Sequence, residues 1–159
     1  MEAHFYNVDV KWKSDRKGEI SSSEISQKLE VATPPQFPKG MENRWSPEHL
    51  FTAAVSSCLM TTFLAIAENS KLDFVNFECS SKGKLEQIDG KFLMTEVILE
   101  PVVTIKNESE REKAEKVLQK SEANCLISNS VKSKITMRDK IVIILLLTYV
   151  CICFVPEKI

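Results

Sequence analysis

Cysteines are the residues of this chain with the most distinctive chemistry. The five thiols stand at positions 58, 79, 125, 151 and 153. Cys58 lies within the apolar run AAVSSCLMTTF, and Cys125 continues the apolar stripe of a second helical segment. A buried cysteine is most often a small core residue, yet two thiols on packed helices can join in a reversible disulfide. Sequence spacing does not tell whether their Cα atoms lie within the ~7 Å that a disulfide requires.

A nucleophilic cysteine also needs a group that favours its thiolate, since a free thiol titrates near ~8.5. Arg16, in a turn, and Arg44, just before the helix that carries Cys58, are both candidates. Glu48 precedes Cys58 by ten positions, or about 15 Å of helical rise, so the two side chains cannot meet on one straight helix. Its spacing favours a first-turn interaction of Glu48 with the helix dipole over a catalytic role, and both roles stay open.

The remaining composition narrows the classes of function. A net charge of −1 gives no reason to expect nucleic acid as a partner. The chain has 4 glycines and lacks the glycine-rich phosphate-binding patterns. Its 2 histidines show no usual zinc spacing, so we expect neither a metal nor a bound cofactor. The N-terminus lacks the pattern of a signal peptide, and we expect a cytoplasmic protein whose cysteines are kept as thiols.

Alternating apolar residues predict an antiparallel meander in the first third of the chain. Strands are expected over residues 6–12 and 26–32, around a turn at 15–18. Residues 33–45 contain three prolines and form a loop. Farther on, strands at 72–88 and 91–105 are joined at Asp89-Gly90, a strong hairpin signal.

Two helices are expected to position the thiols. The first begins at Ser46, a suitable N-cap, continues through Pro47 to about residue 69, and carries no charge between Glu48 and Glu68. Such a helix is buried and central. The second covers residues 107–123, where Asn107 and Glu110 are spaced like a capping box. A short strand at 135–137 follows.

Three segments resemble the family of osmotically inducible protein C and organic hydroperoxide resistance protein (OsmC/Ohr), in its OsmC-like subgroup. The stretch RWSPEHLFTAAVSSCLMTTFLAIAE resembles the central helix of that family, with Pro47, Glu48, Leu50, Phe51 and Cys58 matching its pattern. ANCLISNSVKSKI resembles the segment of the second cysteine, here Cys125, although Leu126 replaces the proline that often follows it. DRKGEI resembles the hairpin that carries the family's active-site arginine, which corresponds to Arg16.

The resemblance, over about residues 5–138, implies an α+β fold. In it, antiparallel sheets wrap around two central helices and two chains interlock as a homodimer, with active sites at the subunit interface. Residues 1–138 would form the OsmC-like domain, and 139–159 an apolar tail of unknown role. The apolar run 141–155 is shorter than the about 20 residues of a membrane span, so membrane attachment is not expected.

The resemblance also implies the activity of a thiol-dependent peroxidase that reduces organic hydroperoxides. Cys58 would attack the peroxide as a thiolate, Cys125 would close a disulfide with it, and an external dithiol would reduce that disulfide. Arg16, held by Glu48, would favour the thiolate. The alternative is a catalytically silent OsmC-like dimer that binds a small apolar ligand.

Overall fold

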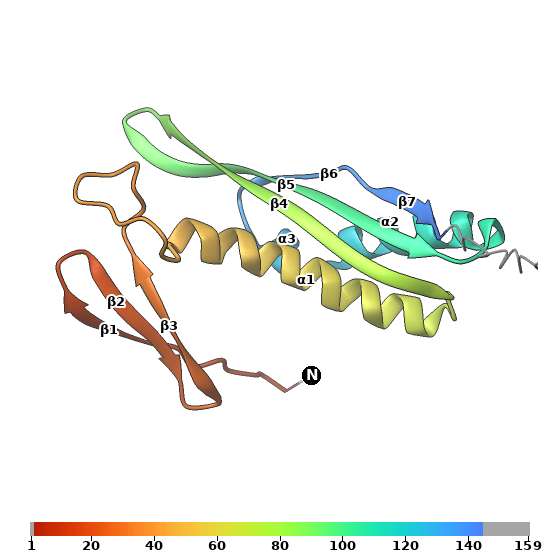
Figure 1. Cartoon of the computed structure of the whole chain (residues 1–159), viewed down its shortest axis with the longest axis horizontal. Coiled ribbons are helices and arrows are strands. Elements are labelled where there is room, and N and C mark those ends of the chain that lie inside the picture. The colour runs from red at the N-terminus through yellow and green to blue at the C-terminus, as the bar shows by residue number, and fades with distance from the viewer. Residues whose placement is uncertain (1, 145–159) are drawn as a thin grey trace, which may run out of the picture.

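The computed structural model describes residues 2–144, which form two parts joined at the start of a long helix (Figure 1). The first part is an antiparallel three-stranded sheet of β1 (Asp9–Ser14), β2 (Lys17–Ser22) and β3 (Ile25–Ala32), in that order. It confirms the expected meander and adds β2 as a complete strand. In Figure 1 this sheet projects away from the layer of long strands and helices.

Helix α1 (Pro47–Asn69) begins where the sequence predicted. The Ser46 backbone is extended, and its hydroxyl accepts a hydrogen bond from the His49 N–H. The His49 Nδ1 in turn accepts from the Ser46 N–H at 3.3 Å. A histidine thereby completes a capping box whose third residue is usually Glu or Gln.

The second part is built on a long hairpin of β4 (Phe74–Ile88) and β5 (Lys91–Ile105). Asp89 and Gly90 both have positive φ, 49° and 76°, as a two-residue hairpin turn requires. Two short strands, β6 (Lys134–Met137) and β7 (Lys140–Ile143), lie one after the other beside β5 and pair with it in parallel. The sheet is therefore mixed, and the expectation of purely antiparallel sheets is corrected. A parallel return is possible because the helical segment after β5 carries the chain back.

Helices α1 and α2 (Arg111–Asn124) pack against each other and against the sheet. Alternate residues of β5 face them: Val97 and Leu99 meet Val55 and Leu59 of α1, while Val103 and Ile105 join Phe63 and the apolar side of α2. Within residues 2–144, α1 is the one helix that is long and apolar enough to cross a membrane. It instead contacts β4, β5, α2 and the short helix α3 (Leu126–Ser130), as a core helix does.

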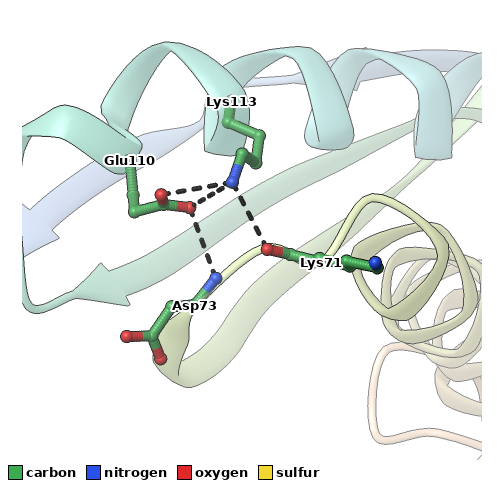
Figure 2. Close-up of polar contacts among 4 residues, drawn as sticks. All are labelled: Lys71, Asp73, Glu110 and Lys113. Carbon is green, nitrogen blue, oxygen red and sulfur yellow. Dashed lines mark hydrogen bonds and ion pairs between the residues drawn. The ribbon is translucent and has the colours of Figure 1, made fainter.

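The start of α2 differs from the expectation. A 3₁₀ turn (Glu108–Glu110) precedes α2, and the Asn107 side chain makes no capping hydrogen bond. The Glu110 carboxylate instead accepts from the Lys113 ammonium at 2.8 Å and from the Asp73 N–H at 3.3 Å, and Lys113 also reaches the Lys71 carbonyl (Figure 2). Glu110 thus ties α2 to the turn between α1 and β4 rather than capping its own helix.

Much apolar surface stays uncovered in the single chain. The buried residues of α1 lie on one side, so the expectation that this helix is enclosed all round does not hold for one chain. On β1, Val10 and Trp12 are each 71% exposed. Part of the segment expected to be a tail belongs to the sheet as β7, with Ile141 buried in the core. Residues 145–159, including Cys151 and Cys153, lie outside the described residues.

Candidate active site

The fold brings Cys58 and Cys125 together although they are far apart in the sequence. Cys58 lies in the middle of α1 on its buried side. Cys125 is the extended residue between α2 and α3, with φ −66° and ψ 108°, and it is fully buried. The Ile127 N–H, two residues beyond Cys125, donates to the Cys58 Sγ at 3.5 Å. Both thiols are free, so the arrangement is that of a reduced pair.

The surroundings of the two sulfurs move their pKa values apart. Burial raises the pKa of the Cys58 thiol, but hydrogen bonds from the Ile127 N–H, the Cys125 thiol, the Thr62 side chain and the Leu126 N–H outweigh it, and the net pKa is lowered. Burial raises the pKa of the Cys125 thiol, and the neighbouring Cys58 sulfur raises it further. Cys58 is therefore the more acidic thiol of the pair.

The two sulfurs also differ in their access to solvent, and the sulfur with the lowered pKa, Cys58, is the more accessible one. A cavity of about 370 Å³ opens onto Cys58, lined by Tyr6, Ala54, Ser57, Thr61, Leu126 and Ile127. Cys58 is 8% exposed and Cys125 is not exposed. A small oxidant entering this cavity meets Cys58 first. The more acidic thiol is also the more accessible one, which is the combination that makes a cysteine reactive.

Arg16 and Glu48 lie together elsewhere, at the N-terminal end of α1. Both line a cavity of about 490 Å³ whose walls include Trp12 and Phe37. Within residues 2–144 no ion pair joins them, and the Glu48 Oε2 is buried without a hydrogen-bond partner. The other candidate cation, Arg44, pairs with Glu30 of β3. Arg16 is thus the arginine that shares a cavity with Glu48.

The four predicted site residues therefore form two pairs. Ten helical positions separate Glu48 from Cys58, about 15 Å of rise, and the described chain does not bring Arg16 to the Cys58 sulfur. The structure adds donors that sequence reasoning missed, the N–H groups of Leu126 and Ile127. Every residue except proline has a backbone N–H, so no residue type could have signalled them.

No group of three or more His, Cys, Asp or Glu side chains among the described residues could hold a metal ion. The third described thiol, Cys79 on β4, lies beside the Ser81 hydroxyl at 3.6 Å. It lines a different cavity, of about 760 Å³, together with Ser56 and His49.

Comparisons with known proteins agree with the fold. The chain is 22% identical over 143 residues to the uncharacterized protein YmaD of Bacillus subtilis, covering 87% of this chain and 93% of that protein. An OsmC-like protein of unknown function from Vibrio cholerae superposes with a TM-score of 0.77 at 25% identity, over 86% of this chain and 99% of that one. An organic hydroperoxide resistance protein from Legionella pneumophila superposes with a TM-score of 0.71 at 20% identity, over 89% and 99% of the two chains.

A family model matches most of the segment that carries the thiols. It is described as OsmC-like protein and covers residues 40–138, which include α1, the long hairpin, α2, α3 and β6. The match spans more than half of the chain and contains Glu48, Cys58 and Cys125. With its α+β architecture and its structural neighbours, this chain belongs to the family of OsmC-like proteins.

Proposed function

We propose that this chain is a thiol-dependent peroxidase that reduces organic hydroperoxides through a Cys58 thiolate and a Cys58–Cys125 disulfide. One observation carries the proposal: two thiols remote in the sequence lie side by side, with the pKa of the accessible one lowered and that of the buried one raised. A pair of inert core cysteines needs no such asymmetry. A peroxidase needs it, because one sulfur must attack and the other must wait.

The first step oxidises Cys58. Its thiolate attacks the outer oxygen of the hydroperoxide, the O–O bond breaks, and the organic alkoxide leaves and takes up a proton as the alcohol. Cys58 is then a sulfenic acid. The sulfur supplies both electrons, so the step needs no metal and no bound cofactor. The cavity over Cys58 gives the oxidant its route.

The second step closes the disulfide. The Cys125 sulfur attacks the Cys58 sulfenic acid, the S–O bond breaks, and the hydroxide leaves as water with the proton from Cys125. Burial of Cys125 keeps solvent oxidants from reaching it first. An external dithiol then restores both thiols by exchange and becomes a disulfide itself. An external dithiol reductant suits a cytoplasmic protein.

A homodimer completes the site in this proposal. Arg16 and Glu48 at one end of α1 are brought to Cys58 of the partner subunit, where Glu48 holds Arg16 in a charge-assisted pair and Arg16 faces the thiolate. The unpartnered Glu48 oxygen and the shared cavity support this pairing. So does the exposed apolar surface of β1 and α1, which a second copy would bury.

The apolar walls of the Arg16 cavity favour an organic peroxide over hydrogen peroxide. Val10, Trp12, Val31 and Phe37 line this cavity together with the charged residues Asp15, Arg16, Lys17 and Glu48. An alkyl or aryl group of the hydroperoxide can bury its surface there, whereas hydrogen peroxide has none to bury. The chain's balanced charge gives no reason to add nucleic acid as a partner.

A peroxide titration tests the proposal. One equivalent of an organic hydroperoxide should remove two hydrogens from the intact chain and link the Cys58 and Cys125 peptides, as seen by mass spectrometry. Cys58→Ser should abolish turnover with a dithiol, and Cys125→Ser should leave a sulfenic acid that a dimedone-type probe traps. Cys79→Ser is the matched control and should behave as wild type. Unchanged turnover in Cys58→Ser, or no disulfide at all, would leave the silent dimer that binds an apolar ligand.

A further inference from the structure

The turn after Cys125 is placed to act on the other thiol. Helix α3 begins at Leu126, and its first hydrogen bond runs from the Asn129 N–H to the Cys125 carbonyl at 3.0 Å. The N–H groups of the residues before Asn129 have no acceptor within the helix, as at any helix start. The Ile127 N–H finds its acceptor in the Cys58 Sγ. The Leu126 N–H lies near the same sulfur and also lowers its pKa.

We propose that the backbone N–H groups of Ile127 and Leu126 stabilise the Cys58 thiolate, so that the segment carrying the resolving thiol also activates the attacking one. The inference rests on the proposed function, and it assigns to this turn a role beyond holding Cys125. Hydrogen bonds to an ionised acceptor are roughly twice as strong as those between neutral groups. Both donors therefore favour the charged sulfur over the neutral thiol.

The backbone donors to Cys58 belong to the same subunit, whereas the Arg16 side chain of that subunit does not reach Cys58. Their positions are set by the fold of one subunit, since α3 packs directly against α1. Arg16 lies at the far end of α1 and reaches no Cys58 within its own chain. The pKa of the Cys58 thiol is then lowered within one subunit, before any partner side chain arrives. Loss of Arg16 should slow turnover while leaving Cys58 more acidic than an ordinary thiol.

Leu126→Pro removes one donor with little other change. Proline is accepted at the first position of a helix because its missing N–H has no helical partner. The extended backbone of Cys125, ψ 108°, also suits a residue that precedes proline. Leu126→Ala is the matched control, because it removes the same exposed side chain but keeps the N–H. The readout is the rate of Cys58 alkylation by iodoacetamide against pH, followed on the Cys58 peptide by mass spectrometry.

The Ile127 N–H, which lowers the Cys58 pKa more than the Leu126 N–H does, is removed by an ester at position 127. Incorporating the α-hydroxy analogue of isoleucine replaces the N–H by oxygen and keeps the side chain. We expect the Cys58 pKa to rise by about one unit, a tenfold slower alkylation below that pKa. The shift in Leu126→Pro should be in the same direction and smaller. An ester at Asn129 is the control, since it removes the first α3 hydrogen bond without touching Cys58.

The outcomes separate this inference from the proposed function. An unchanged Cys58 pKa in both the Leu126→Pro chain and the ester at 127 would overturn the inference, as would equal shifts in either control. Alkylation needs no peroxide. A chain with the expected pKa shifts but no peroxide turnover would refute the proposed function alone, and normal turnover with no shifts would refute this inference alone.

Discussion

A heterodimer of two differently impaired subunits tests whether the site is shared between chains. One subunit carries Arg16→Ala and the other Cys58→Ser, with different affinity tags so that the mixed dimer is purified from co-expression. In the described chain, Cys58 and the Arg16 cavity are separated by ten positions of α1, about 15 Å. If Arg16 serves the partner, the intact Cys58 of the first subunit meets the intact Arg16 of the second. One of two equivalent sites is then complete.

The expected turnover is about half that of the wild-type dimer. If Arg16 instead served its own chain, neither site in the mixed dimer would be complete. The rate would then be about half that of the Arg16→Ala homodimer, because only one subunit keeps Cys58; we expect that homodimer to be reduced about 10- to 100-fold by loss of one charge-assisted interaction. Pairing Arg44→Ala with Cys58→Ser is the control, because Arg44 is engaged by Glu30. Peroxide turnover at a fixed thiol concentration is the assay. No recovery in the mixed dimer would refute the shared site.

Three further predictions concern the elements that hold the site. Phe63→Ala should lower the free energy of unfolding by about 3–5 kcal/mol, because Phe63 is fully buried against two other rings. Urea denaturation at one protein concentration measures this free energy. Phe5→Ala, at an exposed position, should change it little. Ser46→Ala should cost about 1 kcal/mol through loss of the cap on α1, measured in the same way, whereas Ser57→Ala at an exposed helix position should not. Glu110→Gln should destabilise the chain at neutral pH, and the difference from wild type should vanish in acid. The hydrogen bond from Lys113 lowers the pKa of Glu110 in the folded chain. The stabilisation by the ionised Glu110 is therefore present above its unfolded pKa of about 4.3, and it is lost as the pH falls through its folded pKa. A difference that persisted in acid would contradict that reasoning.

Local signals in the sequence predict most of the fold. The Ser46-Pro47 start of α1 and the Asp89-Gly90 turn act through backbone geometry that the residue types themselves favour, and both are confirmed. Asn107 failed as a cap because Glu110, which would have completed the box, is drawn to Lys113 and Asp73 instead. Lys113 is three residues on in the same helix, whereas Asp73 lies in the turn between α1 and β4. The contact with Asp73 is tertiary, and no spacing rule anticipates it.

The sequence likewise indicated part of the candidate site, and the folded chain was needed for the rest. Residue types and family resemblance pointed to Cys58, Cys125, Glu48 and Arg16, and the fold places them in two pairs. No sequence signal indicated that β6 and β7 pair in parallel with β5, or that the short helix α3 would form. Yet α3 supplies a backbone donor to the Cys58 sulfur, the Ile127 N–H. Backbone groups are chosen by position, so only the folded chain reveals them.

The length of α1 between the two pairs constrains the proposed homodimer. A two-fold axis that sets Glu48 of each subunit beside Cys58 of the partner subunit must pass near the midpoint of that stretch, at position 53. The helix surface there is made of small side chains, and Ala54 and Ser57 are exposed. Small residues allow two helices to approach closely, whereas large ones would hold the halves of the site apart. The ten-residue spacing thus links the symmetry of the dimer to the chemistry, since a shift along α1 that separated the two pairs would leave Cys58 with its backbone donors but no guanidinium.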